Sequence, residues 1–167
     1  MTVLRYGRRS LSVDDEYTIH VSVPLDSDGF LRRECPHCRH QFKWHNGAAN
    51  EEAESQSRPP AYSCPLCGQP AADDSWNTPE QVELFERAAM PVALEAVQDE
   101  LESMFRGMKG FTYKRGRDEV AEPAEPIVEP DDMTIVTSPC HDFEPVKVPD
   151  DHTGTLYCLI CGSAFAV

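Results

Sequence analysis

Cys35-Pro36-His37-Cys38 and Cys64-Pro65-Leu66-Cys67 are the two stretches that decide the fold of this chain. Each has the form Cys-x-x-Cys, in which one tight backbone bend presents two sulfur atoms together. Zn²⁺ prefers four soft ligands at the corners of a tetrahedron, and two such bends supply four thiolates. The two stretches therefore predict one closed zinc site with the ligands Cys35, Cys38, Cys64 and Cys67.

Short strands are predicted around the first cysteine pair. The alternating, β-branched run Tyr17–Val23 is typical of a strand, and a turn at Asp26–Gly29 leads to a second strand at Phe30–Glu34. Gln41–Trp44 follows the cysteine pair as the return strand of a hairpin. Asn46–Pro60, rich in Ala, Glu, Ser and Asn, is predicted to be a loop inserted before the second pair.

A second cysteine group closes the sequence. Cys158-Leu159-Ile160-Cys161 is followed by Gly162, which repeats the form of Cys64-Pro65-Leu66-Cys67-Gly68, and a glycine there permits the backbone to turn. Together with Cys140, the last pair gives three thiolates, so a fourth ligand is needed. This predicts a second zinc ion.

The identity of that fourth ligand is open between His141 and His152, with Asp142 a distant third. Side chains of adjacent residues tend to point apart, which disfavours Cys140 and His141 binding one ion, whereas a bend at Ser138-Pro139 would let both turn inward. His152 lies in an Asp- and Gly-rich loop. We favour His141, so the predicted ligands of the second site are Cys140, His141, Cys158 and Cys161.

The net charge and the spacing of the cysteines disfavour a nucleic-acid-binding protein and a disulfide scaffold. The formal net charge is −14, from 29 acidic and 15 basic residues, and bound thiolates make it more negative; such a field repels nucleic acid and favours a protein partner. Seven cysteines, six of them in Cys-x-x-Cys pairs, do not suit a disulfide scaffold. No signal peptide or membrane span is predicted, so we expect a cytoplasmic protein. Arginine outnumbers lysine by 11 to 4, a bias that suggests a GC-rich bacterial genome.

A helix is predicted from Thr78 onward. Thr78 is a good N-cap, Pro79 suits the first helical position, and Gln81 completes a capping box. Pro91 is expected to end or kink this helix, because proline lacks the backbone N–H and clashes with the preceding turn.

Apolar residues recur beyond Pro91 with helical spacing. This stripe either packs on the helices or the ribbon, or forms a docking or dimerising face. A protein partner is expected through the residues of the stripe, which are Leu94, Val97, Leu101, Met104, Phe105 and Met108.

A basic segment and an acidic segment follow the stripe. Arg106–Arg117 holds five bases with aromatic residues between them, and with Arg5–Arg9 it is a candidate nucleic-acid contact. Alternatively, its charges cap the C-terminus of the helix and offset the acids that follow. Residues 118–132 contain seven acids and three prolines, which predicts an extended linker outside any core. Everything after about Met133 is a separate small module or a tail that folds back.

The chain resembles the zinc-ribbon and treble-clef class of zinc modules over Phe30–Gly68, and less closely over Cys140–Phe165. The predicted fold class is α+β, a zinc-stapled β-ribbon followed by a helical segment and a second small zinc module. The predicted division is residues 1–77 (ribbon), 78–117 (helical segment), 118–132 (linker) and 133–167 (C-terminal module).

The function favoured by these patterns is that of a non-enzymatic zinc-binding adaptor or accessory subunit. A four-cysteine site is closed to substrate, and the sequence contains no phosphate-binding Gly-rich loop and no HExxH motif. A zinc ribbon that binds nucleic acid is the alternative, and a zinc-dependent redox switch is the second alternative.

Overall fold

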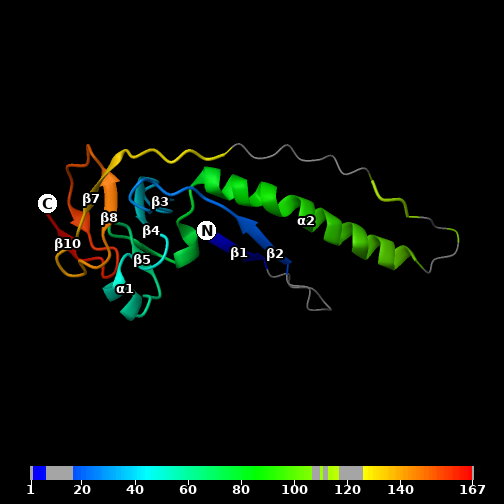
Figure 1. Ribbon diagram of the computed structural model, residues 1–167, viewed down its shortest axis with the longest axis horizontal. Coiled ribbons are helices and arrows are strands. Elements are labelled where there is room, and N and C mark those ends of the chain that lie inside the picture. The colour runs from blue at the N-terminus through cyan, green and yellow to red at the C-terminus, as the bar shows by residue number, and fades with distance from the viewer. Residues whose placement is uncertain (1, 7–16, 107–109, 111–112, 117–125, 167) are drawn as a thin grey trace. The chain divides into compact units, whose positions relative to one another are not determined.

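Antiparallel strands and one long helix make up the α+β fold that the sequence predicts (Figure 1). The computed structural model describes residues 2–6, 17–106, 110, 113–116 and 126–166. The chain divides into two compact units, one formed by Met1–Ser22 with Glu80–Pro126 and the other by Val23–Pro79 with Ile127–Val167. Among the described residues, no helix combines the length and the apolar character that a membrane span requires.

The first unit contains a hairpin and most of the long helix. β1 (Thr2–Tyr6) pairs antiparallel with β2 (Tyr17–Val21), with Thr2 opposite Val21. The strand predicted over Tyr17–Val23 is thus present. Its partner β1 was not predicted, because five residues with only two consecutive aliphatic side chains give a weak strand signal until a neighbour pairs with them.

The helix α2 spans Pro79–Phe105, and proline occupies its first position as predicted. Pro91 lies inside this helix, so of the two outcomes expected at Pro91 the end of the helix is wrong, and the kink stays a prediction. The proline removes the N–H that would bond to the carbonyl of Arg87. Ala, Leu, Glu and Gln are good helix formers and are frequent on both sides of Pro91. Their helix propensity offsets the hydrogen bond lost at the proline.

The second unit is built on a four-stranded antiparallel sheet in the order β3-β4-β8-β7. The hairpin of β3 (Phe30–Glu34) and β4 (Gln41–His45) is the one predicted. A second hairpin, β7 (Met133–Val136) with β8 (Val146–Pro149), joins it because β8 pairs with β4. The segment after about Met133 was expected to be either a separate small module or a tail that folds back, and this pairing shows that it folds back. The four-part division of the chain by residue boundaries stays a prediction.

Smaller elements complete the second unit. Two short hairpins pair β5 with β6 and β9 with β10. A short helix and a 3-10 turn lie between the strands. Their bounds are β5 (Tyr62–Ser63), β6 (Pro70–Ala71), β9 (Leu156–Tyr157), β10 (Ala164–Phe165), α1 (Glu51–Ser55) and η1 (Asp73–Ser75).

The helix α1 corrects the prediction that Asn46–Pro60 is all loop. The Asn50 side chain accepts a hydrogen bond from the Ala53 N–H at 2.9 Å, which caps the helix, and Ala53 is buried. Asn50 also donates to the carbonyl of Phe143 at 3.1 Å. This segment is anchored by a long-range contact that its polar composition does not reveal.

The core of the second unit is aromatic and encloses the first cysteine cluster. Trp76 lies 5.7 Å from Phe42 and 5.5 Å from Trp44 between ring centroids, in edge-to-face arrangements. Trp76, Phe42, Cys35 and Cys64 all have 0% exposure. Cys35 and Cys64 therefore belong to the same buried core as these aromatic rings, with Cys38 and Cys67 packed against it.

Two buried lysines lie on the other face of the sheet. Lys43 of β4 and Lys147 of β8 are directly opposite one another and are 0% and 1% exposed. Because neighbouring strand residues face opposite sides, they point away from Phe42 and Trp44. They contact a group of carboxylates, which are Asp26, Asp28, Glu129, Asp131 and Asp132.

This acidic group revises one expectation for the 118–132 segment. The segment was expected to lie outside any core, but the Glu129 side chain is only 3% exposed and lies 2.9 Å from the Lys43 ammonium. Asp131 lies 2.7 Å from Lys147. The end of the acidic segment therefore neutralises lysines that the sheet buries.

Candidate metal sites

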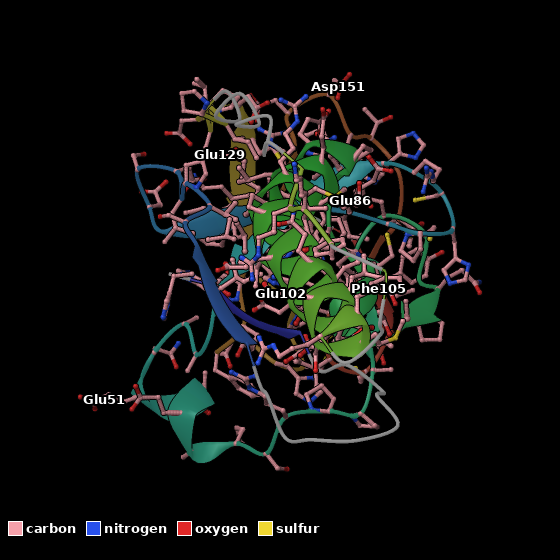
Figure 2. All side chains as sticks on the ribbon, turned by 90° about the vertical axis from the view of Figure 1, so that its right-hand side faces the viewer. Glu51, Glu86, Glu102, Phe105, Glu129 and Asp151 are labelled. Carbon is pink, nitrogen blue, oxygen red and sulfur yellow. The ribbon has the colours of Figure 1, made fainter. Side chains whose placement is uncertain are left out.

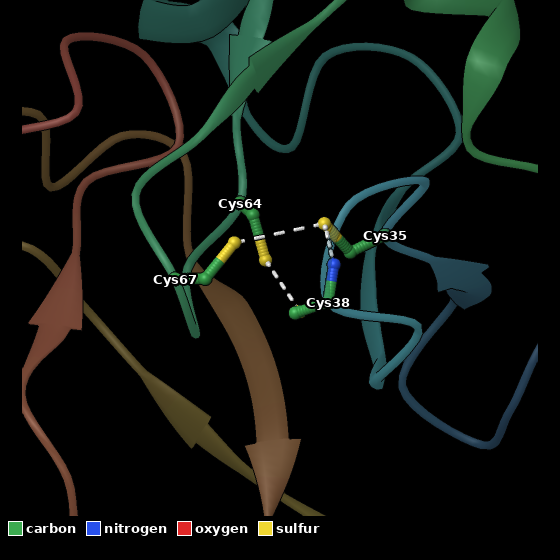
Figure 3. Close-up of side chains that lie close together, drawn as sticks. All are labelled: Cys35, Cys38, Cys64 and Cys67. Carbon is green, nitrogen blue, oxygen red and sulfur yellow. Dashed lines mark hydrogen bonds between the residues drawn. The ribbon is translucent and has the colours of Figure 1, made fainter.

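The four cysteines of the two Cys-x-x-Cys stretches lie together, as predicted, with all their sulfur atoms within 4.8 Å of one another (Figure 3). The Cys35 and Cys67 sulfurs are 3.7 Å apart, and those of Cys38 and Cys64 are 3.9 Å apart. All four are free thiols, and these distances are far longer than the roughly 2.0 Å of a disulfide. We refer to these four residues as site 1.

The local backbone explains why the sulfurs converge. In the first turn the Cys35 N–H donates to the His40 carbonyl at 3.0 Å, and the Arg39 N–H donates to the Cys35 carbonyl at 2.9 Å. Arg39 has a φ of 62°, a conformation that glycine adopts more easily. Such a turn aims backbone N–H groups at sulfur, and the His37 N–H lies 3.4 Å from the Cys35 sulfur.

The second turn of site 1 repeats this pattern. The Cys64 N–H donates to the Gln69 carbonyl at 2.9 Å, and the Gly68 N–H donates to the Cys64 carbonyl at 2.8 Å. Gly68 has a φ of 74°, as expected for the glycine after the pair. The Leu66 N–H approaches the Cys64 sulfur at 3.4 Å.

The geometry of site 1 fits a tetrahedral zinc ion. With Zn–S bonds of about 2.3 Å, sulfur atoms at the corners of a tetrahedron are about 3.8 Å apart. The two cross-turn distances, 3.7 and 3.9 Å, lie on either side of this value. The residues present therefore match the size and the donor set that the ion requires.

The titration of these thiols shows why a cation suits the site. Burial raises the pKa of the Cys35 thiol, but hydrogen bonds from the N–H groups of Cys38 and His37 and from the thiols of Cys64 and Cys38 together bring its pKa below the usual value. Burial raises the pKa of Cys64, and the neighbouring Cys35 raises it further. One thiolate therefore opposes the ionisation of the next, and a divalent cation removes that repulsion.

The second predicted group also converges, in the same unit of the chain. Cys140, His141, Cys158 and Cys161 place their ligand atoms within 4.8 Å of one another, and we refer to them as site 2. The sulfurs of Cys140 and Cys161 are 3.5 Å apart, and His141 Nδ1 lies 3.3 Å from the Cys158 sulfur. In a tetrahedral zinc site these separations would be about 3.8 and 3.6 Å.

Of the two histidines that the sequence left open, the structure brings one, His141, into the group. His141 lies within the group, whereas His152 is not among the residues whose ligand atoms meet there. The backbone turns at Ser138-Pro139, where the Ser138 hydroxyl donates to the His141 carbonyl at 3.1 Å. This bend lets the adjacent Cys140 and His141 side chains face the same point.

Site 2 differs from site 1 in exposure. Cys140 and Cys161 are exposed, whereas Cys158 is buried. The Ser163 hydroxyl and backbone N–H hold the pKa of Cys161 at about 6, well below its usual range. Both Cys35 and Cys64 of site 1 are fully buried, so site 2 is the more accessible of the two.

Ser138 contacts the Cys158 thiol of site 2, and the sequence did not predict this contact. Its hydroxyl lies 3.3 Å from the Cys158 sulfur and it is 5% exposed. The signal that would have found it is the alignment of Ser138-Pro139-Cys140-His141 with Cys35-Pro36-His37-Cys38. In that alignment Ser138 occupies the place of the first cysteine, and the proline is shared.

The residues predicted to meet a partner lie on α2. Leu94, Val97 and Met104 are 44%, 39% and 65% exposed, whereas Leu101 and Phe105 are partly buried. Met108 lies outside the described residues. In Figure 2, Glu86, Glu102 and Phe105 are labelled along this helix.

The predicted basic segment is described only in part. Arg106 pairs with Glu102 at 3.5 Å, and Arg115 pairs with Glu102 at 3.1 Å and with Asp99. Lys109 and Arg117 lie outside the described residues, as do most of Arg5–Arg9. Arg106 and Arg115 thus pair with acids of α2, which precede the basic segment in the sequence.

The chain was compared with known proteins at the levels of family, sequence and fold. No family model matches it, and no curated protein or solved structure is significantly similar to it. What the structure establishes is therefore an α+β chain with two cysteine-rich clusters suited to holding metal ions.

Proposed function

We propose that this protein is a non-enzymatic zinc-binding adaptor that holds a protein partner in a larger assembly. Two zinc ions would fix the second unit as a rigid platform, and an apolar face of α2 would dock the partner. The observation that carries the proposal is the convergence of two complete four-ligand sets.

The donor sets favour zinc and a structural role. Four thiolates, or three thiolates and one imidazole, are typical of closed tetrahedral zinc sites. A closed site leaves no coordination position for water or substrate, which argues against metal-centred catalysis. When bound, the metal supplies structural cross-links, and the cysteines and His141 hold it.

The docking face consists of exposed apolar side chains of α2 with acidic side chains beside them. Leu94, Val97 and Met104 recur on one side of α2 and are more than one-third exposed. At 3.6 residues per turn, Glu86 and Glu100 lie beside them on the same side of α2, and both are exposed. The occupant that fits this face is a protein groove with an apolar floor and a basic rim.

The test is a gentle affinity purification of the full chain from its native host, with nuclease treatment, beside two variants. Leu94→Asp with Met104→Asp is expected to lose the protein partner and keep its zinc. Glu51→Gln, at an exposed site on α1, is the control and is expected to keep both. Recovery of nucleic acid that salt removes, without a protein partner, would contradict the proposal.

A redox switch at site 2 is the second candidate, and the exposure of Cys140 and Cys161 favours it. Their sulfurs, 3.5 Å apart, are within easy reach of a disulfide. Hydrogen peroxide would oxidise the two thiolates to a disulfide, take up two protons, form two water molecules and release the zinc ion. If mild peroxide releases no zinc, or releases it from site 1 first, this second candidate fails.

A further inference from the structure

We infer that the two metal sites fill cooperatively, each ion favouring the binding of the other. This inference rests on the proposed zinc binding and adds a property that neither site has alone. The contact responsible is formed by the two glycine-ended turns, Cys64–Gly68 of site 1 and Cys158–Gly162 of site 2, which we call the paired turns.

Two reciprocal hydrogen bonds join the paired turns. The Ser63 N–H donates to the Leu159 carbonyl at 2.8 Å, and the Tyr157 N–H donates to the Pro65 carbonyl at 2.9 Å. In each case the residue before the first cysteine donates to the residue after the first cysteine of the other turn. The two bonds are therefore equivalent by an approximate two-fold relation.

The side-chain packing follows the same relation. A Cβ atom on Gly68 would lie 2.8 Å from the ring of Tyr157, and one on Gly162 would lie 3.0 Å from the hydroxyl of Ser63. Each turn thus presses its glycine against the residue that donates the hydrogen bond from the other turn. Glycine is required twice over, by the left-handed φ of 74° and 69° and by this close approach.

The rest of the second unit repeats the relation. Each half runs strand, ligand pair, strand, and then a small hairpin that carries a Cys-x-x-Cys-Gly turn. The two large hairpins join through β4 and β8, with Lys43 opposite Lys147. The small hairpins have matching registers, since Tyr62 pairs with Ala71 and Leu156 pairs with Phe165.

Cooperativity follows from this arrangement. A metal ion at site 1 fixes the turn Cys64–Gly68 and so orients the Ser63 N–H and the Pro65 carbonyl for the other turn. Site 2 then forms against an ordered surface, and the conformational entropy lost on its metal binding is smaller. By linkage, metal at site 2 favours site 1 by the same factor.

The experiment is native mass spectrometry of the full, reduced chain as zinc is added below two equivalents. Independent sites would make the singly loaded chain the most abundant species at half saturation. We expect instead that chains with no zinc and chains with two zinc ions dominate, with a coupling factor of about tenfold or more. A dominant singly loaded species overturns the inference and leaves the proposed zinc binding intact, whereas failure to bind zinc at all overturns both.

A matched pair of variants tests whether the paired turns carry the coupling. Tyr157→Ala removes the ring that packs on Gly68, and Tyr157→Phe keeps it. Both retain the backbone hydrogen bond to Pro65 and all eight ligands. The alanine variant is expected to accumulate the singly loaded chain, and the phenylalanine variant to behave like the parent. Equal coupling in all three proteins would refute the role assigned to this contact.

Discussion

Replacing Lys43 with Met should destabilise the second unit by about 3 kcal/mol. The substitution keeps most of the apolar stem and removes the charge. The Lys43 ammonium lies 2.9 Å from Glu129, 3.1 Å from Asp26 and 3.3 Å from Asp132, and the Asp26 and Glu129 side chains are almost completely buried. Without Lys43, the buried carboxylates of Asp26 and Glu129 lose a charged partner at a place where little solvent can replace it.

The size of this destabilisation depends on the basic partners that each carboxylate keeps in Lys43→Met. Breaking a buried ion pair by removing one partner typically costs about 3–5 kcal/mol. Here Asp26 keeps Lys147 at 2.9 Å, and Glu129 and Asp132 keep Arg32 at 2.9 and 2.6 Å. Because each acid keeps a second base, we expect the lower end of that range.

The assay is urea unfolding at a fixed free zinc concentration, followed by tryptophan fluorescence. Trp44 and Trp76 are the only tryptophans of the chain, and both are buried in the second unit. Arg58→Met, at an exposed position, is the control and should change stability by less than about 0.5 kcal/mol. Adding Glu129→Gln to Lys43→Met should recover part of the loss. A loss for Lys43→Met no larger than that of the control would refute the reasoning.

Three further outcomes are expected from the same structure. Burial raises the pKa of Asp26, but hydrogen bonds from Lys147, the Phe30 N–H and Lys43 bring it down to about 2 from its usual 3.8. The stabilisation this gives is present above pH 3.8 and is lost as the pH falls toward 2, so the stability difference between the parent and Asp26→Asn should shrink over that window; a difference independent of pH would contradict it. Phe42→Ala, at a fully buried site against Trp76, should cost about 3–5 kcal/mol in urea unfolding, and a cost below about 1 kcal/mol would show that the aromatic core is misassigned. Pro91→Ala should stabilise α2 by up to about 3 kcal/mol and raise its thermal midpoint by circular dichroism, whereas an unchanged or lowered midpoint would mean that the proline is not a helix defect.

The convergence of the two cysteine groups could be predicted because neighbouring residues in the sequence determine each ligand turn. A Cys-x-x-Cys pair specifies its own turn, and Gly68 and Gly162 mark where the backbone needs a left-handed conformation. The hairpin of β3 and β4 was likewise visible from alternation and a turn. His141 could only be favoured from the sequence, since its selection depends on a bend at Ser138 that packing determines.

The structural features that the sequence did not predict depend on contacts between distant segments of the chain. β4 and β8 are about one hundred residues apart in the sequence, and neither strand contains a pattern that predicts pairing with the other. Lysine is rarely buried, so the sequence did not indicate that Lys43 and Lys147 are buried. Their burial depends on ion pairs with the carboxylates of residues 129–132. The same applies to β1 and α1, each of which needs a partner that lies elsewhere in the chain.

The most direct test of the central claim is the metal content of the purified, reduced chain, measured by elemental analysis with X-ray absorption at the zinc edge. The account predicts two zinc ions per chain and a combined first coordination shell of seven sulfurs and one nitrogen, from Cys35, Cys38, Cys64, Cys67, Cys140, His141, Cys158 and Cys161. A chain that folds with its tryptophans buried and holds no zinc, or whose zinc is bound mainly by oxygen, would contradict it.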